Sequence, residues 1–182
     1  MAQRIGALGN VALKDGRSVM IRNLRDADRE ALATFGQSLP KNDLLYLEQD
    51  FTHPQIIDHL VDGVNAEHWR QIVAITHDEQ IVGYTAALRM PGWSNHVANI
   101  QLIVQPAYRR SGLGMQLAQA IVEEARDFGA TKVTVDMLAA LNAGQAIFSR
   151  LGFAVEGQLA RHAIDRDGNL HDIVIMSAFV RV

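Results

Sequence analysis

The sequence predicts an α+β fold: a three-layer domain in which a mixed, mostly antiparallel sheet carries helices on both faces. The first observation is a run from His96 to Val104 that alternates as a half-buried strand does. The second is an apolar stripe behind it, with the three- and four-residue spacing of a helix face: Leu113, Leu117, Ile121, Ala125 and Phe128. The third is the mixture of further strands and helices along the chain, which is typical of one layered domain.

The first half of the chain contributes two helices and several strands. Met1 to Gly16 is weakly patterned, and we expect an edge strand around Asn10 to Leu13 followed by a strand from Ser18 to Arg22. Asp26 is predicted to be the N-cap of a helix from Ala27 to about Ser38. The later elements are a helix from Pro54 to about Val64, a hairpin of residues 71–76 and 80–90, and the strand that ends at Val104.

The second half is predicted to alternate helices with strands. Gly129 is expected to end the long helix that begins at Leu113. The elements after it are a strand from Lys132 to Met137, a short helix from Asn142 to Arg150, and a hairpin of residues 155–164 and 170–180 around Asp167-Gly168. We expect one domain over residues 1–182, with its core from about residue 19 and with residues 1–18 as an extension or edge strand.

Composition excludes several classes of function. The chain has no cysteine, which excludes disulfides, thiolate metal sites and a cysteine nucleophile. A net charge of −3 gives no reason to expect nucleic acid or an anionic membrane as partner. The first ten residues lack the apolar core of a signal peptide, and no apolar run is long enough to span a membrane. We therefore expect a cytoplasmic protein without a metal.

The turn from Gln105 to Gly114, between the central strand and the long helix, is basic and rich in glycine. The first N–H groups of a helix have no intrahelical partner and carry partial positive charge. Gly112 and Gly114 leave these groups open to a phosphate, and Arg109 and Arg110 add charge. The alternative is a surface turn with two solvated arginines. The Gly-Lys-Ser/Thr ending of the NTPase phosphate loop and the dinucleotide Gly-x-Gly-x-x-Gly pattern are both absent.

The residues Arg109-Arg110-Ser111-Gly112-Leu113-Gly114 are similar to the Gln/Arg-x-x-Gly-x-Gly/Ala motif of the GNAT superfamily of N-acetyltransferases. The preceding strand resembles the family's central strand, and Leu151-Gly152-Phe153 resembles its later Leu-Gly-Phe signature. The resemblance covers roughly Val19 to the C-terminus. It implies an N-acetyltransferase that uses acetyl-CoA, or another acyl-CoA, as donor.

The resemblance also implies where the donor binds. The diphosphate would lie on the amides of Arg110 to Gly114, and the pantetheine arm would pair with backbone of Leu102 to Val104 like an added strand. For this the central strand must separate from residues 132–137 and open a V-shaped slot, where the Val104 N–H would polarise the thioester carbonyl. The implied coenzyme-binding residues are Leu102, Ile103, Val104, Arg109, Arg110, Ser111, Gly112, Leu113, Gly114, Asn142 and Phe148.

The sequence departs from the family at the positions that carry the general acid and the general base. Phe148 stands where relatives carry a tyrosine as general acid, and Asn99 stands where many carry a glutamate as general base. Asn142 lies one residue away from the expected asparagine position. Since cysteine is absent, direct attack of an amine on the thioester is the simplest mechanism, and a base matters more than an acid.

Three histidines are candidates for carrying that proton: His96, His162 and His171. If Asp167-Gly168 forms a two-residue turn, Ile164 faces His171, and His162 lies diagonally on the same face. The alternative is that these histidines are solvated or packed residues. No histidine pair has metal-binding spacing.

Glu48, Asp50 and His53 lie in a segment that, in the family, usually walls the acceptor site; the alternative is a solvated loop. Trp69 and Trp93 are expected in the core or lining the slot.

The acceptor could be a small amine, a protein N-terminus or a lysine. Two other hypotheses stay open: a non-catalytic acyl-CoA-binding domain, and a module that binds nucleotides or small anions. A homodimer is also open, because two-fold dimers are the commonest oligomers.

Overall fold

The computed structural model describes residues 8–41, 43 and 49–181. The strands in these ranges form one sheet in the order β1-β2-β3-β4-β5-β6-β8-β7. Every neighbouring pair is antiparallel except β5 and β6, which run parallel. The strands are β1 (Gly9–Ala12), β2 (Ser18–Asn23), β3 (Trp69–Ile75), β4 (Ile81–Arg89), β5 (Val97–Val104), β6 (Lys132–Leu138), β7 (Ala154–Ile164) and β8 (Leu170–Phe179).

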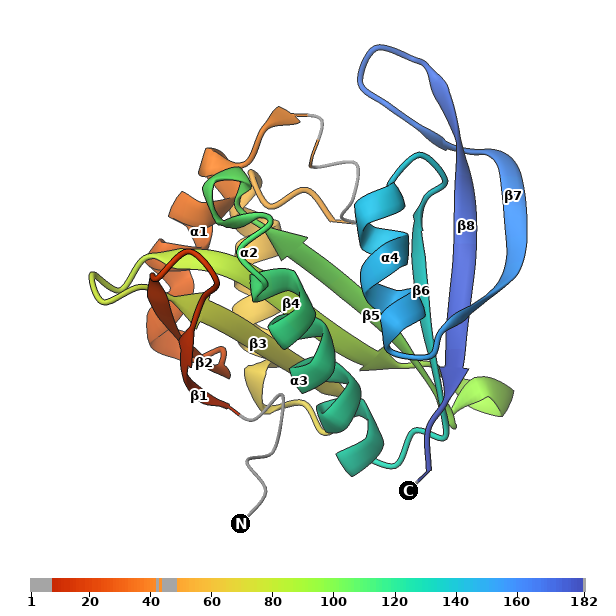
Figure 1. The fold of residues 1–182 in the computed structure, drawn as a ribbon, viewed down its shortest axis with the longest axis horizontal. Coiled ribbons are helices and arrows are strands. Elements are labelled where there is room, and N and C mark those ends of the chain that lie inside the picture. The colour runs from red at the N-terminus through yellow and green to blue at the C-terminus, as the bar shows by residue number, and fades with distance from the viewer. Residues whose placement is uncertain (1–7, 42, 44–48, 182) are drawn as a thin grey trace.

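The sheet is covered on both faces, as the sequence predicts. Figure 1 shows α3 (Leu113–Asp127) and α4 (Asn142–Arg150) on one face, while α1 (Arg29–Ser38) and α2 (Pro54–Asp62) pack on the other. The parallel β5–β6 pair needs a crossover, and α3 supplies it. Strand β4 is buried along most of its length because apolar layers lie on both sides of it.

Each face has its own apolar core. The predicted stripe of α3, from Leu113 to Phe128, is buried against β3, β4 and β5. The stripe of α2 packs with α1 and with Tyr84 on the opposite face. The predicted stripe of α3 is confirmed, because the helical period places its members on the side that faces the sheet.

Two local predictions are wrong. A 3₁₀ turn over Asp26–Asp28 precedes α1, and the Arg25 N–H donates to the carboxylate of Asp28, 2.8 Å away, so Asp26 is not the capping residue. Trp69 is buried as predicted, but the side chain of Trp93 is 96% exposed on the turn before β5. No helix in the described ranges is long and apolar enough to cross a membrane.

Candidate active site

Strands β5 and β6 pair over only half of their length. Their register runs from Val97 opposite Lys132 to Ile100 opposite Val135. Beyond that point β5 stays paired with β4 as far as Val104, and β6 stays paired with β8 as far as Leu138. The two strands therefore separate while each keeps its outer partner, and the predicted V-shaped slot opens between them.

A cavity of about 630 Å³ fills this slot. Strand residues alternate between the faces of a sheet, and lining residues come from both faces. Val135 and Met137 belong to the face under α3 and α4, whereas Asn99 and Asp136 belong to the opposite face. The cavity therefore passes between the strands, so that a ligand on one face can meet a ligand on the other.

The backbone of β5 presents free edge groups to this slot. Gln105 donates its N–H to the Val82 carbonyl, 2.9 Å away, so that residue faces β4. Because backbone groups alternate in direction along an antiparallel ladder, the amides of Leu102 and Val104 face away from β4 and into the slot. They lie where the pantetheine arm and the thioester carbonyl are expected to bind.

The turn ahead of α3 is held in an unusual backbone conformation. Arg110 and Gly112 have φ angles of 60° and 90°. The hydroxyl of Ser111 donates to the Tyr108 carbonyl, 2.6 Å away, and the first bond of the helix runs from the Gln116 N–H to the Gly112 carbonyl. The amides ahead of Gln116 thus lack intrahelical partners, and this end of α3 can hold an anion.

Gly114 brings this end of the helix close to the slot. A Cβ built on Gly114 would lie 3.0 Å from Ile147 of α4 and 3.9 Å from Val104 of β5. A larger residue here would occupy the space between the helix and the strand. Gly114 thus has a steric reason in the structure, whereas Gly112 is favoured by its φ of 90°.

The side chain of Arg109 is fixed by two contacts within the protein. Its Nε donates to the Val104 carbonyl, 3.0 Å away, and its guanidinium pairs with the buried carboxylate of Asp43. Arg109 and Arg110 both line the cavity. Asp43 had no signal in the sequence, because only the fold brings it to a partner 66 positions away.

Most of the predicted coenzyme-binding residues lie together. Leu102, Ile103, Val104, Arg109, Arg110, Gly112, Gly114 and Phe148 line the cavity. Phe148 is 2% exposed and stacks edge-on with Phe153, with 5.1 Å between the ring centroids. Ser111 and Leu113 are buried beside the cavity, and Asn142 is exposed at the start of α4; the described lining does not include these three.

The three candidate histidines lie elsewhere. None of them is among the described residues that line the cavity. His96 precedes β5 at the end far from the slot, and His162 is exposed on β7. The Nε2 atom of His171 lies 2.9 Å from a carboxylate oxygen of Asp165 near the hairpin tip. Hydrogen bonds from His171 and Asn169 hold the pKa of the Asp165 carboxyl far below its usual value.

The register predicted for this hairpin is wrong. Ala163 faces His171 and Ile164 faces Leu170, and the turn spans residues 165–169. Asp165 causes the longer turn, because its carboxylate accepts the backbone N–H groups of Asp167 and Asn169. A bulge between Leu159 and Ala163, with φ of 52° at Arg161, also removes His162 from the predicted diagonal position.

The open face of the slot carries polar side chains. The amide nitrogen of Asn99 lies 3.3 Å from the Thr134 hydroxyl, which places both residues on this face. Gln101 and Asp136 are two residues further along the same strands and therefore share the face. Asp136 contributes the only carboxylate among the described lining residues. Asp136 could not be identified from the sequence, because a strand with one acidic residue looks like any strand that borders a core.

Two segments meet beyond this face. Arg166, at the tip of the β7–β8 hairpin, pairs with Asp50 in the segment before α2. His53 Nε2 lies 3.6 Å from the same carboxylate. Of the residues expected to wall the acceptor site, Asp50 and His53 thus lie at this junction, and Glu48 lies outside the described residues. Within those residues, no cluster of three or more His, Asp or Glu could hold a metal ion.

Known proteins share this sequence pattern and fold. The acetyltransferase (GNAT) family matches residues 37–153. A probable N-acetyltransferase 14 from Danio rerio is 35% identical over 85 residues, which are 46% of this chain and 29% of that protein. The chain thus spans less than a third of that relative.

Solved structures agree on the fold. The GNAT domain of S. lividans PAT has a TM-score of 0.78 at 16% identity and covers 95% of this chain and 97% of its own. A putative acetyltransferase from Salmonella typhimurium, solved with its cofactor acetyl-CoA, has a TM-score of 0.76 at 17% identity, with 90% and 95% covered. From the family match, the turn and the slot together, the chain belongs to the acetyltransferase (GNAT) family.

Proposed function

We propose that this protein transfers an acetyl group from acetyl-CoA to a primary amine by direct attack. The observation that carries the proposal is the cavity that passes between β5 and β6 and is lined from both faces of the sheet. Such a passage lets a donor lie on the α3 and α4 face while an acceptor approaches from the other. The two ligands then meet at the level of Val104 without sharing a binding surface.

The donor side fits an acyl-CoA in charge and in shape. The N-terminal amides of α3, with Arg110, suit a diphosphate. The outward amides of Leu102 and Val104 suit the amide groups of pantetheine, which would pair with β5 as an added strand. The Val104 N–H points to where charge develops on the thioester oxygen. Phe148 and Ile147 supply apolar wall for the arm.

The acceptor side supplies a base. An amine of pKa near ~10.4 is protonated at pH 7, and neutralising it costs about 4–5 kcal/mol. The Asp136 carboxylate would accept this proton first, and the neutral amine would then attack the thioester carbonyl. The new C–N bond forms, the C–S bond breaks, and the electron pair leaves with sulfur. A thiol of pKa near ~8.5 leaves as thiolate at a cost of about 2 kcal/mol, so no general acid is needed in place of Phe148.

A second candidate is a domain that binds acyl-CoA without turnover. It is favoured by Phe148, which is buried against Phe153 and has no proton to give, and by Asn99, which cannot act as a base. This domain would hold the donor on one face of the slot and would bind no acceptor on the other face.

A thermal-shift titration with acetyl-CoA, CoA and ADP tests the donor site. A ligand at one hundred times its dissociation constant stabilises the folded state by about 2.7 kcal/mol, which raises Tm by several degrees at this size. We expect clear shifts with both coenzyme forms and a smaller one with ADP. An equal shift with ADP, or none with any ligand, would refute the donor site.

Release of free thiol, followed over a panel of small amines, amino-acid amides and peptides, then tests turnover. Thiol release that depends on one acceptor class supports the enzyme and names the class. Binding of CoA with no release for any acceptor would favour the non-catalytic domain.

A further inference from the structure

The hairpin of β1 and β2 lies against the turn that precedes α3. Its own turn, residues 13–17, is closed by a 2.7 Å bond from the Leu13 N–H to the Arg17 carbonyl. The Lys14 N–H then donates to the Ser111 carbonyl, 2.9 Å away, inside the glycine-rich motif. A segment that the sequence showed only as a weak edge strand is therefore bonded directly to the candidate phosphate site.

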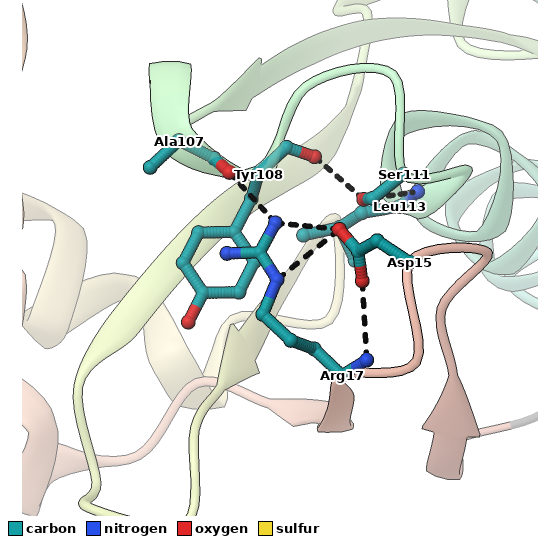
Figure 2. A network of polar contacts seen from close by, with 6 residues as sticks. All are labelled: Asp15, Arg17, Ala107, Tyr108, Ser111 and Leu113. Atoms are coloured by element: carbon teal, nitrogen blue, oxygen red, sulfur yellow. Dashed lines mark hydrogen bonds and ion pairs between the residues drawn. The ribbon is translucent and has the colours of Figure 1, made fainter.

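A second set of contacts fixes how the hairpin docks. The Arg17 guanidinium donates to the Ala107 carbonyl, 2.7 Å away, and to the Asp15 carboxylate, 2.6 Å away. Both contacts are drawn in Figure 2. The Arg17 guanidinium also lies 3.8 Å from the centre of the Tyr108 ring. The hydrogen bond from Arg17 lowers the pKa of the Asp15 carboxyl, so Asp15 stays ionised and paired at neutral pH. Arg17 thus positions the turn, with its charge already matched by Asp15.

Docking places the Lys14 side chain along Gly112. Three of its carbons, Cε, Cγ and Cδ, lie 3.4, 3.5 and 3.6 Å from where a Cβ of residue 112 would be. Lys14 lines the cavity together with Arg109 and Arg110. Arg109 is neutralised by Asp43, whereas no carboxylate in the described ranges forms an ion pair with Lys14. Lys14 is therefore a cation beside Gly112 in the cavity lining, with no ion-pair partner among the residues that the structure describes.

We propose that Lys14 binds the diphosphate of the acyl-CoA donor, and that the β1–β2 hairpin is part of the donor site. This inference rests on the proposed function. Backbone amides at the start of α3 and the Lys14 ammonium would hold the diphosphate from two sides. The φ of 90° at Gly112 favours glycine there, and the lysine stem lies at van der Waals distance from this residue.

Titration calorimetry with CoA and with dephospho-CoA tests the proposal. Lys14→Gln removes the charge, and we expect it to weaken binding of both ligands about tenfold, as loss of a charge-assisted phosphate contact does. It should also reduce the dependence of the dissociation constant on salt, because one charge contact is gone. Arg126→Gln is the matched control, since it removes one positive charge at the far end of α3 and should change neither quantity.

Arg17→Gln separates positioning from general destabilisation. If Arg17 acts by placing Lys14, Arg17→Gln weakens CoA binding in the native background and adds little in the Lys14→Gln background. Additive losses in the double variant would contradict this positioning role.

The outcomes separate the two claims. If the wild-type protein and Lys14→Gln bind CoA equally well, this inference is overturned and the proposed function stands. A loss with CoA but not with dephospho-CoA would also overturn it, because the contact would then be to the 3′-phosphate. Wild-type protein that binds no coenzyme would refute both.

Discussion

Asp136 shows how one side chain acquires a role from the gap beside it. Strand β6 turns Asp136 toward the open face, one residue beyond the last pairing with β5. Had the two strands stayed paired, the same carboxylate would lie on an ordinary sheet surface. Because they separate, it lines the passage in which an amine would meet the thioester.

Asp136→Asn should lower kcat/KM about 10²–10⁴-fold at pH 7, which is the range for loss of a general base. The deficit should shrink as the pH approaches the pKa of the acceptor amine, near ~10.4, because the amine is then neutral without help. A pH–rate profile of the variant beside wild type measures this. Affinity for CoA, by calorimetry, should stay unchanged.

Asn99→Ala is the matched control for this prediction. Asn99 lines the same cavity and shares the face with Asp136, but its amide cannot accept the proton. Its loss should reduce activity by a factor that does not vary with pH. A deficit for Asp136→Asn that is constant across the pH range would mean that the carboxylate only shapes the site.

The sequence could identify residues whose role is set by their neighbours in the chain. The turn from Arg109 to Gly114 is such a case, because the geometry of a helix N-terminus is local. Lys14, Asp43 and Asp136 are the opposite case. Each meets the site only through the fold, so no spacing in the sequence marks it.

At the scale of elements, the junction of β2 with α1 depends on Asp28. Its carboxylate pairs with the Arg22 guanidinium at 2.7 Å and accepts the Arg25 N–H at 2.8 Å. Burial alone would raise the pKa of the Asp28 carboxyl, but these hydrogen bonds outweigh burial and hold the pKa below its usual value. One side chain therefore ties a strand, a turn and the start of a helix.

Asp28→Asn should lower the free energy of unfolding by about 1–3 kcal/mol at pH 7, because it leaves a half-buried arginine without its charge partner. Since the folded pKa is depressed, this stabilisation is present above the unfolded pKa of ~3.9 and is lost as pH falls through the folded pKa. Urea unfolding at pH 7 and at successively lower pH measures the difference between variant and wild type. A gap that does not narrow in acid would contradict the electrostatic origin.

Elements with strong periodicity could be predicted, and their junctions could not. The stripes of α2 and α3 and the strand pattern of β5 follow from spacing alone. The bulge of β7 and the turn at Asp165 follow from side-chain bonds: the carboxylate of Asp172 accepts the Arg161 N–H, and that of Asp165 accepts two N–H groups. Such bonds change the register by a residue, and a hydrophobic pattern does not record them.

At the scale of the whole molecule, the slot lies between two halves of one sheet. Strand β5 pairs with β4, which belongs to the first half of the chain, whereas β6 pairs with β8, which belongs to the second half. Among the described strands, the two halves pair with each other only along the short parallel register, and α3 connects them. A contact that bridges the halves on the open side therefore bears on the shape of the site.

The ion pair between Arg166 and Asp50 is such a bridge, joining the β7–β8 hairpin tip to the segment before α2 across 116 positions. It is solvent-exposed, so Arg166→Gln should change the free energy of unfolding by less than about 1 kcal/mol. Local opening should respond more strongly than global unfolding. Hydrogen exchange should speed up at residues 165–169 and around residues 49–53, while β5 and α3 keep their protection.

Lys132→Gln provides the matched comparison, because Lys132 pairs with Glu156 at the other end of β7, 2.7 Å away. Its loss should speed exchange near residues 154–157 and leave the hairpin tip as in wild type. If both variants loosened the same segment, the hairpin would open as one unit, and the Arg166 contact would be no bridge. If only Arg166→Gln also raises KM for the acceptor with KM for acetyl-CoA unchanged, the junction walls the acceptor side of the slot.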